Sequence, residues 1–135
     1  MDRLFLDANV LFTAAHNPLG KAAFLIEPPG EAPWRVITSA LAVAEALRNI
    51  RLKAPQSVVR LQDLARRVAL VPQPPPAPVS VALPEKDRPI YAAARAARAS
   101  HLITGDLRHF GALMNRPAAT DGMVVQTVSD YLRGL

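Results

Sequence analysis

Hydrophobic and polar residues alternate along the chain in blocks that predict short buried strands, each followed by a helix. Five short stretches have the length and composition of strands, at residues 4–6, 35–37, 69–71, 101–104 and 123–126. Helical patterns predict helices over residues 9–15, 20–26, 56–68 and 88–99, and a short helix near the C-terminus. Thr38 or Ser39 is placed to cap a further helix that runs to about residue 50.

This alternation predicts an α/β fold in which helices cover both faces of a mainly parallel sheet of about five strands, giving three layers. A chain of 135 residues is long enough to bury a real core, and we expect residues 1–135 to form a single domain. The Pro-rich segment at residues 72–89 departs from the pattern. It cannot be regular helix and is expected to be extended.

The composition excludes several classes of protein. Half of the residues are apolar and 20% are charged, which is ordinary for a soluble globular chain, and no apolar run is long enough for a membrane helix. Asp2 and Asp7 do not fit a signal peptide, so we expect a cytoplasmic protein with no membrane association. There are no cysteines, and His16, His101 and His109 lack the spacing of a zinc motif. A bound metal would therefore be a hard ion with oxygen ligands.

The net charge of +5 and the pI of about 10.4 indicate a polyanionic partner, of which nucleic acid is the commonest. Many basic proteins bind nothing specific, so charge alone does not decide the function.

Two aspartates follow predicted strands. Asp7 lies in the apolar stretch RLFLDANVLF after the first strand, and Asp106 follows the fourth strand in LITGDLRHF. Sites in parallel α/β folds lie outside the carboxyl ends of the strands, where the strand order reverses. If the first and fourth strands are neighbours, both carboxylates enter one crevice. Each aspartate also has a simpler explanation, as the cap of a helix or turn.

Two further acids fall near the same crevice. Glu45 lies in SALAVAEAL, in a predicted helix that is apolar on nearly every side and is therefore expected to be buried. A pair with Arg48 one turn later is the simpler role for Glu45, but such a pair stabilises a helix by only a few tenths of a kcal/mol. Asp87 precedes Arg88 and a proline, where a capping aspartate is common.

Four converging carboxylates in a basic protein indicate a divalent metal site. The carboxylates would repel one another, and Mg²⁺ or Mn²⁺ relieves that repulsion while bridging to a substrate phosphate. Water bound to such an ion is easier to deprotonate and can attack phosphorus. The chemistry that this arrangement favours is phosphodiester hydrolysis.

Several segments resemble the PIN-domain ribonucleases, a family that includes the toxins of VapBC-type toxin–antitoxin modules. They are LDANVL, AEAL, EKDRPIYAAARAARASHLITGD and the following LRHFG, and together they extend over almost the whole chain. The third segment is the most specific, because an acid, an alanine-rich helix, a strand and Thr-Gly-Asp occur together in it. The Pro-rich insert before Asp87 is the main departure from the family pattern.

The resemblance implies a PIN-like α/β/α sandwich and Mg²⁺- or Mn²⁺-dependent endonucleolytic cleavage of RNA. By position, the catalytic and metal-binding acids are Asp7, Glu45, Asp87 and Asp106, and Glu45 either binds the metal or orients the attacking water. Polar residues at Asn9, Ser39 and Thr104 would support these acids. The family also implies an antitoxin partner. A homodimer is expected as well, and the apolar faces of the first helices could support it, although core packing is the simpler use of those faces.

The remaining polar residues refine this hypothesis. No histidine pair is placed to activate a 2′-hydroxyl, so attack by water is expected to leave a 5′-phosphate and a 3′-hydroxyl. Candidates for phosphate contact are basic, of which two or three are expected to touch substrate: Arg48, Arg51, Lys53, Arg88, Arg95, Arg98 and Arg108. We expect His109 and Phe110 to anchor the turn after Asp106.

Two alternatives remain open. The first is a catalytically inactive PIN-like module that binds RNA or takes part in an assembly. The second is a phosphatase of the haloacid-dehalogenase type or a phosphotransfer receiver domain, which also place an acid after the first strand. Such phosphatases need a second aspartate two residues later, where this chain has Asn9, and a receiver needs its phosphoacceptor after a middle strand. Both forms of the second alternative are therefore disfavoured.

Overall fold

A computed structural model describes all residues 1–135, and its centre is a single five-stranded sheet. The strands lie in the order β3-β2-β1-β4-β5 and every neighbouring pair is parallel. Their bounds are β1 (Asp2–Leu6), β2 (Trp34–Ser39), β3 (Ala69–Val71), β4 (His101–Ile103) and β5 (Val124–Gln126). The parallel five-stranded sheet expected from the sequence is thus confirmed.

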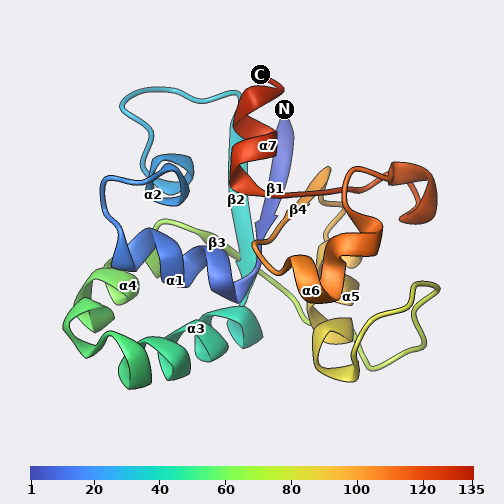
Figure 1. Ribbon diagram of the computed structural model, residues 1–135, viewed down its shortest axis with the longest axis horizontal. Coiled ribbons are helices and arrows are strands. Elements are labelled where there is room, and N and C mark those ends of the chain that lie inside the picture. Colours follow the sequence, from blue (N-terminus) through green and yellow to red (C-terminus); the bar gives the residue numbers. More distant parts are fainter.

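Seven helices surround the sheet. They are α1 (Ala8–His16), α2 (Lys21–Ile26), α3 (Ala40–Lys53), α4 (Val58–Ala65), α5 (Arg88–Ala96), α6 (Leu107–Phe110) and α7 (Val128–Arg133). Short 3-10 turns are η1 (Pro55–Ser57), η2 (Glu85–Asp87), η3 (Gly111–Leu113) and η4 (Pro117–Ala119). Figure 1 shows α1 to α4 gathered on one side of the sheet and α5 and α6 on the other, with α7 near the two chain termini. The three-layer α/β/α arrangement is therefore also confirmed.

The strand order reverses between β1 and β4, which are the central neighbours. Their register pairs Leu6 with Ile103, so the residues that follow the two strands leave the sheet side by side. The backbone N–H of Asp7 continues this pairing by donating to the carbonyl of Ile103 at 3.0 Å. The condition stated from the sequence, that the first and fourth strands are neighbours, is met, and the ends of both strands lie where parallel α/β folds bind ligands.

The core explains why the last three residues of β1 are all apolar, whereas the strand begins with Asp2 and Arg3. Leu4, Phe5 and Leu6 are fully buried, as expected for a central parallel strand that helices cover on both faces. No helix is both long and apolar enough to cross a membrane.

The structure corrects the sequence-based elements in three places. The helix predicted over residues 56–68 is instead η1 followed by the shorter α4, and α5 ends at Ala96 rather than near residue 99. The short helix α6 was not predicted, because four residues are too few to show a helical period. The Pro-rich segment contains no helix over residues 72–84, as expected, but its last five residues lie in η2 and the start of α5.

The inference that α3 is buried on all sides is wrong. Its buried residues, Ala42, Ala46 and Ile50, form a single stripe, and Leu41 is 48% exposed. Glu45 is half-buried. The prediction of burial failed because α3 is rich in alanine. Alanine counts as apolar, but it is small enough to be exposed to solvent at little cost and is favoured in helices for its propensity alone.

The C-terminal helix is fixed to the first strand by one tyrosine. The Tyr131 hydroxyl donates to Asp2 Oδ2 at 2.7 Å, and the ring packs edge-on against Trp34 and His101. Burial and this hydrogen bond raise the pKa of Tyr131 above its ordinary value. The second tyrosine differs, since the hydroxyl of Tyr91 is buried without a hydrogen-bond partner.

We expect Tyr131→Phe to lower the free energy of unfolding by about 1 to 2 kcal/mol, because a hydrogen bond to a charged group is lost. Tyr91→Phe is the matched control. It removes a hydroxyl that has no partner and should leave stability unchanged or slightly higher. Urea unfolding of the three proteins tests this, and equal losses in both variants would contradict the role assigned to the Tyr131–Asp2 hydrogen bond.

Candidate active site

A polar pocket of about 410 Å³ opens beyond the carboxyl ends of β1 and β4. Ten residues line it and none is hydrophobic. All four acids singled out from the sequence, Asp7, Glu45, Asp87 and Asp106, are among them. The structure therefore brings together carboxylates from the residue after β1, from α3, from η2 and from the loop after β4.

Asp7 caps α1 and also faces the pocket. Its Oδ1 accepts from the backbone N–H of Ala8 at 2.7 Å, so the capping role considered from the sequence is real. Its Oδ2 accepts from the hydroxyl of Thr104 at 2.9 Å and from Asn9 Nδ2 at 3.1 Å. Only 3% of Asp7 is exposed. The carboxylate is thus held rigidly at the base of the pocket.

The electrostatic setting of Asp7 is unfavourable for its charge. Burial raises the pKa of its carboxyl above the ordinary 3.8, and the charges of Glu45 and Asp87 raise it further. Hydrogen bonds from Thr104 and the Ala8 amide act in the opposite direction. Because the folded-state pKa is raised, the stability that protonated Asp7 contributes is present at low pH and is lost as the pH rises through that pKa. A bound cation would offset this loss.

Asn9 and Thr104 form the support expected of them, and Ser39 does not. Asn9 Nδ2 also donates to Thr104 Oγ1 at 3.2 Å, and Asn9 Oδ1 accepts from the Gly105 N–H at 2.7 Å, joining α1 to the loop after β4. The side chain of Ser39 instead caps α3 by accepting from the Ala42 N–H. The same residue was considered as a helix cap from the sequence, and that interpretation is correct.

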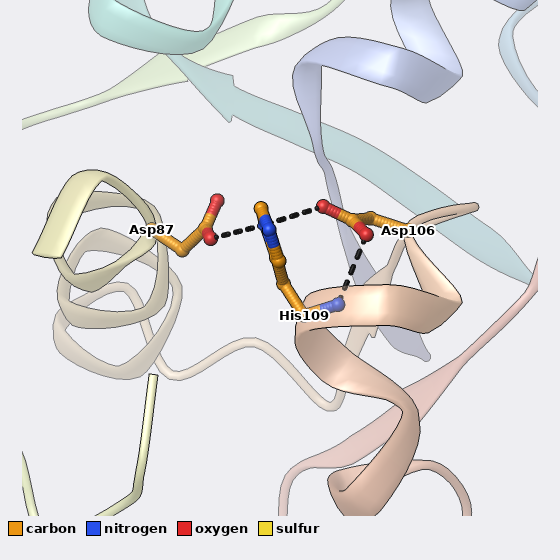
Figure 2. A group of neighbouring side chains, drawn as sticks. All are labelled: Asp87, Asp106 and His109. Atoms are coloured by element: carbon orange, nitrogen blue, oxygen red, sulfur yellow. Dashed lines mark hydrogen bonds and ion pairs between the residues drawn. The ribbon is translucent and has the colours of Figure 1, made fainter. Parts of the chain in front are cut away.

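Asp106 begins α6, and its two carboxylate oxygens have different partners. Oδ1 accepts from the backbone N–H of His109 at 3.0 Å, which is the capping bond of the helix. Oδ2 lies 2.9 Å from Nδ1 of the His109 ring. Capping one turn of helix therefore leaves the second oxygen directed at the histidine (Figure 2).

Asp87 does not act as the helix cap that its position suggested. It precedes α5 but its side chain makes no capping hydrogen bond. The residue is only 8% exposed, and its Oδ2 is buried without a hydrogen-bond partner. A buried carboxylate oxygen without a donor is costly, so this placement favours a role in holding a cation.

Asp87, Asp106 and His109 form the tightest group in the pocket region. Their donor atoms all lie within 4.8 Å of one another, and Nδ1 of His109 is 2.8 Å from Asp87 Oδ2. Figure 2 shows the imidazole between the two carboxylates. These separations are short enough for ion pairs, but the ring N–H direction does not suit a hydrogen bond to either oxygen, and Nδ1 has no hydrogen-bond partner. Asp7 and Glu45 line the same pocket outside this group.

The lysines and arginines of the chain make no salt bridge with the pocket acids. Elsewhere arginines form salt bridges with acids on the surface, as with Glu27, Asp63, Asp121 and Asp130. No lysine or arginine forms a salt bridge with any of the four pocket acids. The charge of this cluster is therefore available to an external ion.

Two features of the region were not predicted from the sequence. His109 anchors the turn after Asp106 as expected, through its backbone N–H, but the position of its ring beside Asp87 was not foreseen. Lys86 lines the pocket and directly precedes Asp87. Of the seven basic candidates, Arg48 lines this pocket, whereas Arg95 pairs with Asp121.

The donor set fits a divalent cation. Three aspartates and a glutamate offer oxygen ligands, and a buried oxygen of Asp87 accepts no hydrogen bond within the protein. Hard divalent ions take such oxygen ligands and retain waters in the remaining positions. The open polar pocket leaves room for those waters and for a substrate phosphate.

The fold has counterparts among solved structures. A chain of VapBC2 from Rickettsia felis matches with a TM-score of 0.63. In that structure VapBC2 is bound to a DNA fragment from its promoter. The match covers 93% of this chain and 98% of that chain at 13% sequence identity. A chain of VapBC-1 from nontypeable Haemophilus influenzae matches with a TM-score of 0.60 and 16% identity, over 94% of this chain and 98% of that one.

These matches confirm the PIN-like α/β/α fold. The similarity to the VapBC chains is one of fold. No protein-family model matches the sequence, and no curated protein matches it.

The hydrogen bond from Thr104 to Asp7 yields a test of the site's electrostatics. We expect the Asp7 carboxyl carbon to titrate above pH 3.8 in an NMR titration, and at still higher pH in Thr104→Val, because the charged form loses a donor. Thr38→Val is the matched control. Thr38 is equally buried but donates to the carbonyl of Leu6. Thr38→Val should therefore leave the pKa of Asp7 unchanged. A titration of Asp7 that does not move in Thr104→Val would refute this account.

Proposed function

We propose that the protein is a Mg²⁺- or Mn²⁺-dependent endoribonuclease that hydrolyses RNA phosphodiester bonds. The observation that supports this most directly is the convergence of Asp7, Glu45, Asp87 and Asp106 on one open polar pocket at the switch point of a PIN-like fold. None of these acids forms a salt bridge with a lysine or arginine of the chain. They are therefore free to bind a divalent ion.

Each acid has a distinct role in the proposal. Asp7, Asp87 and Asp106 hold the metal, since they are the most buried or most firmly positioned of the four. Glu45 is half-buried and lines the pocket from α3, where it joins the ligands or orients the attacking water. A bound Mg²⁺ or Mn²⁺ would neutralise charge on the phosphate and lower the pKa of a coordinated water.

The cations at the pocket favour a polyanionic substrate. Arg48 on α3 and Lys86 before Asp87 stand on the pocket lining among the acids. They are placed to contact the phosphates that flank a scissile bond, which positions the chain without reading its sequence. The net charge of +5 adds long-range attraction for RNA.

The pocket also bears on the kind of RNA cleavage. No histidine lines it, and His109 beside it has no second histidine near it for acid–base attack by a 2′-hydroxyl. Attack by water is therefore proposed, and it leaves a 5′-phosphate and a 3′-hydroxyl.

We further propose that the protein acts in the cytoplasm as the toxin of a VapBC-type module, as a homodimer held inactive by an antitoxin. The similar solved structures are of VapBC proteins, which supports this partner class. An antitoxin side chain of positive charge would complement the unpaired acids.

The nuclease proposal predicts that purified protein cleaves RNA with Mn²⁺ or Mg²⁺ and not with EDTA, giving 5′-phosphate ends. Asp106→Asn should lower the cleavage rate by about 100-fold or more while RNA binding persists. Asp63→Asn is the control, because Asp63 lies on α4 in a surface pair with Arg67. Cyclic phosphate ends would refute the mechanism. RNA binding without cleavage in either metal would favour the inactive PIN-like module.

The toxin proposal predicts that expression of the protein arrests bacterial growth and that Asp106→Asn relieves the arrest. Co-expression of a small protein encoded immediately upstream should also relieve it, by covering the pocket. Growth curves with matched expression levels provide the measurement. Arrest by both the wild type and Asp106→Asn would separate toxicity from catalysis and contradict the proposal.

A further inference from the structure

The group formed by Asp87, Asp106 and His109 contains a nitrogen donor beside two carboxylates. The three residues come from different parts of the chain: the end of η2, the loop after β4, and α6. Nδ1 of His109 lies 2.8 Å from Asp87 Oδ2 and 2.9 Å from Asp106 Oδ2 (Figure 2).

Hydrogen bonding inside the group does not account for the arrangement. Both Nδ1 of His109 and Oδ2 of Asp87 are buried and lack a hydrogen-bond partner, and Asp87 is more than nine-tenths buried. Buried polar atoms are nearly always satisfied in folded proteins. These two lie at ion-pair distance without a hydrogen bond between them, an arrangement that a shared cation accounts for. A cation satisfies an oxygen and an imidazole nitrogen at once, because both present lone pairs.

The distances agree with ligands on one ion. Metal–ligand bonds of about 2.1 Å place neighbouring ligands of an octahedral ion about 3 Å apart. Both nitrogen–oxygen separations, 2.8 and 2.9 Å, are close to that spacing. The spread of all three donor atoms, within 4.8 Å, also leaves room for the two carboxylates on opposite sides of an ion.

The local fold prepares His109 for this position. The capping bond from the His109 N–H to Asp106 Oδ1 fixes the histidine backbone against the aspartate that shares the group. The ring is 22% exposed, so the side chain has solvent on one side and the carboxylates on the other. Asp106 just before α6 and His109 within it therefore supply two donors, and Asp87 of η2 supplies the third.

We propose that His109 Nδ1 is a metal ligand and that this nitrogen makes the centre prefer Mn²⁺ to Mg²⁺. Imidazole binds first-row transition ions well, whereas Mg²⁺ favours carboxylate, carbonyl and water. This inference rests on the metal centre of the proposed function but does not need RNA to be the substrate. It narrows the choice between the two ions, which oxygen ligands alone leave open.

Pulsed electron paramagnetic resonance of the Mn²⁺-loaded wild-type protein tests the ligand directly. We expect a nitrogen hyperfine coupling that changes to the ¹⁵N pattern when the protein carries ¹⁵N-labelled histidine. The result needs no variant, so it holds even if a substitution at His109 prevents folding. A spectrum without histidine nitrogen coupling would overturn the proposal.

Calorimetric titration with Mn²⁺ and with Mg²⁺ tests the preference. His109→Ala should weaken Mn²⁺ binding by about tenfold or more and Mg²⁺ binding much less. His109→Asp should bind both ions with little preference, because its ligands are all oxygen. His16→Ala is the control, since His16 is exposed at the end of α1 and remote from the pocket lining.

The outcomes separate this inference from the proposed nuclease activity. Tighter Mn²⁺ binding in His109→Ala would show that the imidazole obstructs the centre, and would overturn the proposal. Histidine coupling and Mn²⁺ preference in a protein that cleaves no RNA would uphold the inference and refute the nuclease. Metal-dependent cleavage of RNA with no histidine coupling would uphold the nuclease and refute the inference.

Discussion

The parallel pairing of β1 with β4 is the constraint on which the rest of the site depends. Because Leu6 is in register with Ile103, Asp7 and Thr104 leave the sheet side by side, and the Asp7 amide extends the ladder by bonding to Ile103. A shift of one residue would direct the side chains of the strand to the opposite faces. The three fully buried apolar residues of β1 make such a shift costly, so the core itself sets the position of the first carboxylate.

Short-range hydrogen bonds then convert this register into a defined site. Asn9 bonds to Asp7, Thr104 and the Gly105 amide, which joins the start of α1 to the loop after β4. Thr104 donates to Asp7 and also accepts from the Asp106 N–H at 3.1 Å, so two acids share one hydroxyl. This network positions the Asp7 carboxylate and the loop that carries Asp106, whereas the carboxylates of Glu45 and Asp87 lie outside it.

The sequence predicted the fold well because the physical signals for it are local. Apolar runs, helix caps and the alternation of elements suffice to expect a parallel sheet, whereas the pairing of β1 with β4 entered only as a condition. Glu45 shows the limit of such reasoning: its pocket position was correct, but the reason given, burial on all sides of α3, was not. The error arose because alanine reads as apolar whether or not anything covers it.

His109 shows a different limit. Its imidazole contacts Asp87, which lies 22 positions earlier on another element. No local sequence pattern indicates such a contact. The same holds for Lys86, whose place on the pocket follows from how η2 joins α5. Sequence spacing can place residues on one face of a helix, but it cannot show which side chains from separate elements lack hydrogen-bond partners.

The placement of charges shows that the pocket is arranged for binding at the expense of stability. Arginines neutralise Glu27, Asp121 and Asp130 where salt bridges contribute little, at the surface. The buried Asp7 and Asp87 have no such partner, although burial is where an unpaired charge costs most. With 16 lysines and arginines in the chain, cations are not scarce. Their absence from the carboxylates is explained if an external cation takes that position, and the arginine and lysine on the pocket wall then remain free for a phosphate.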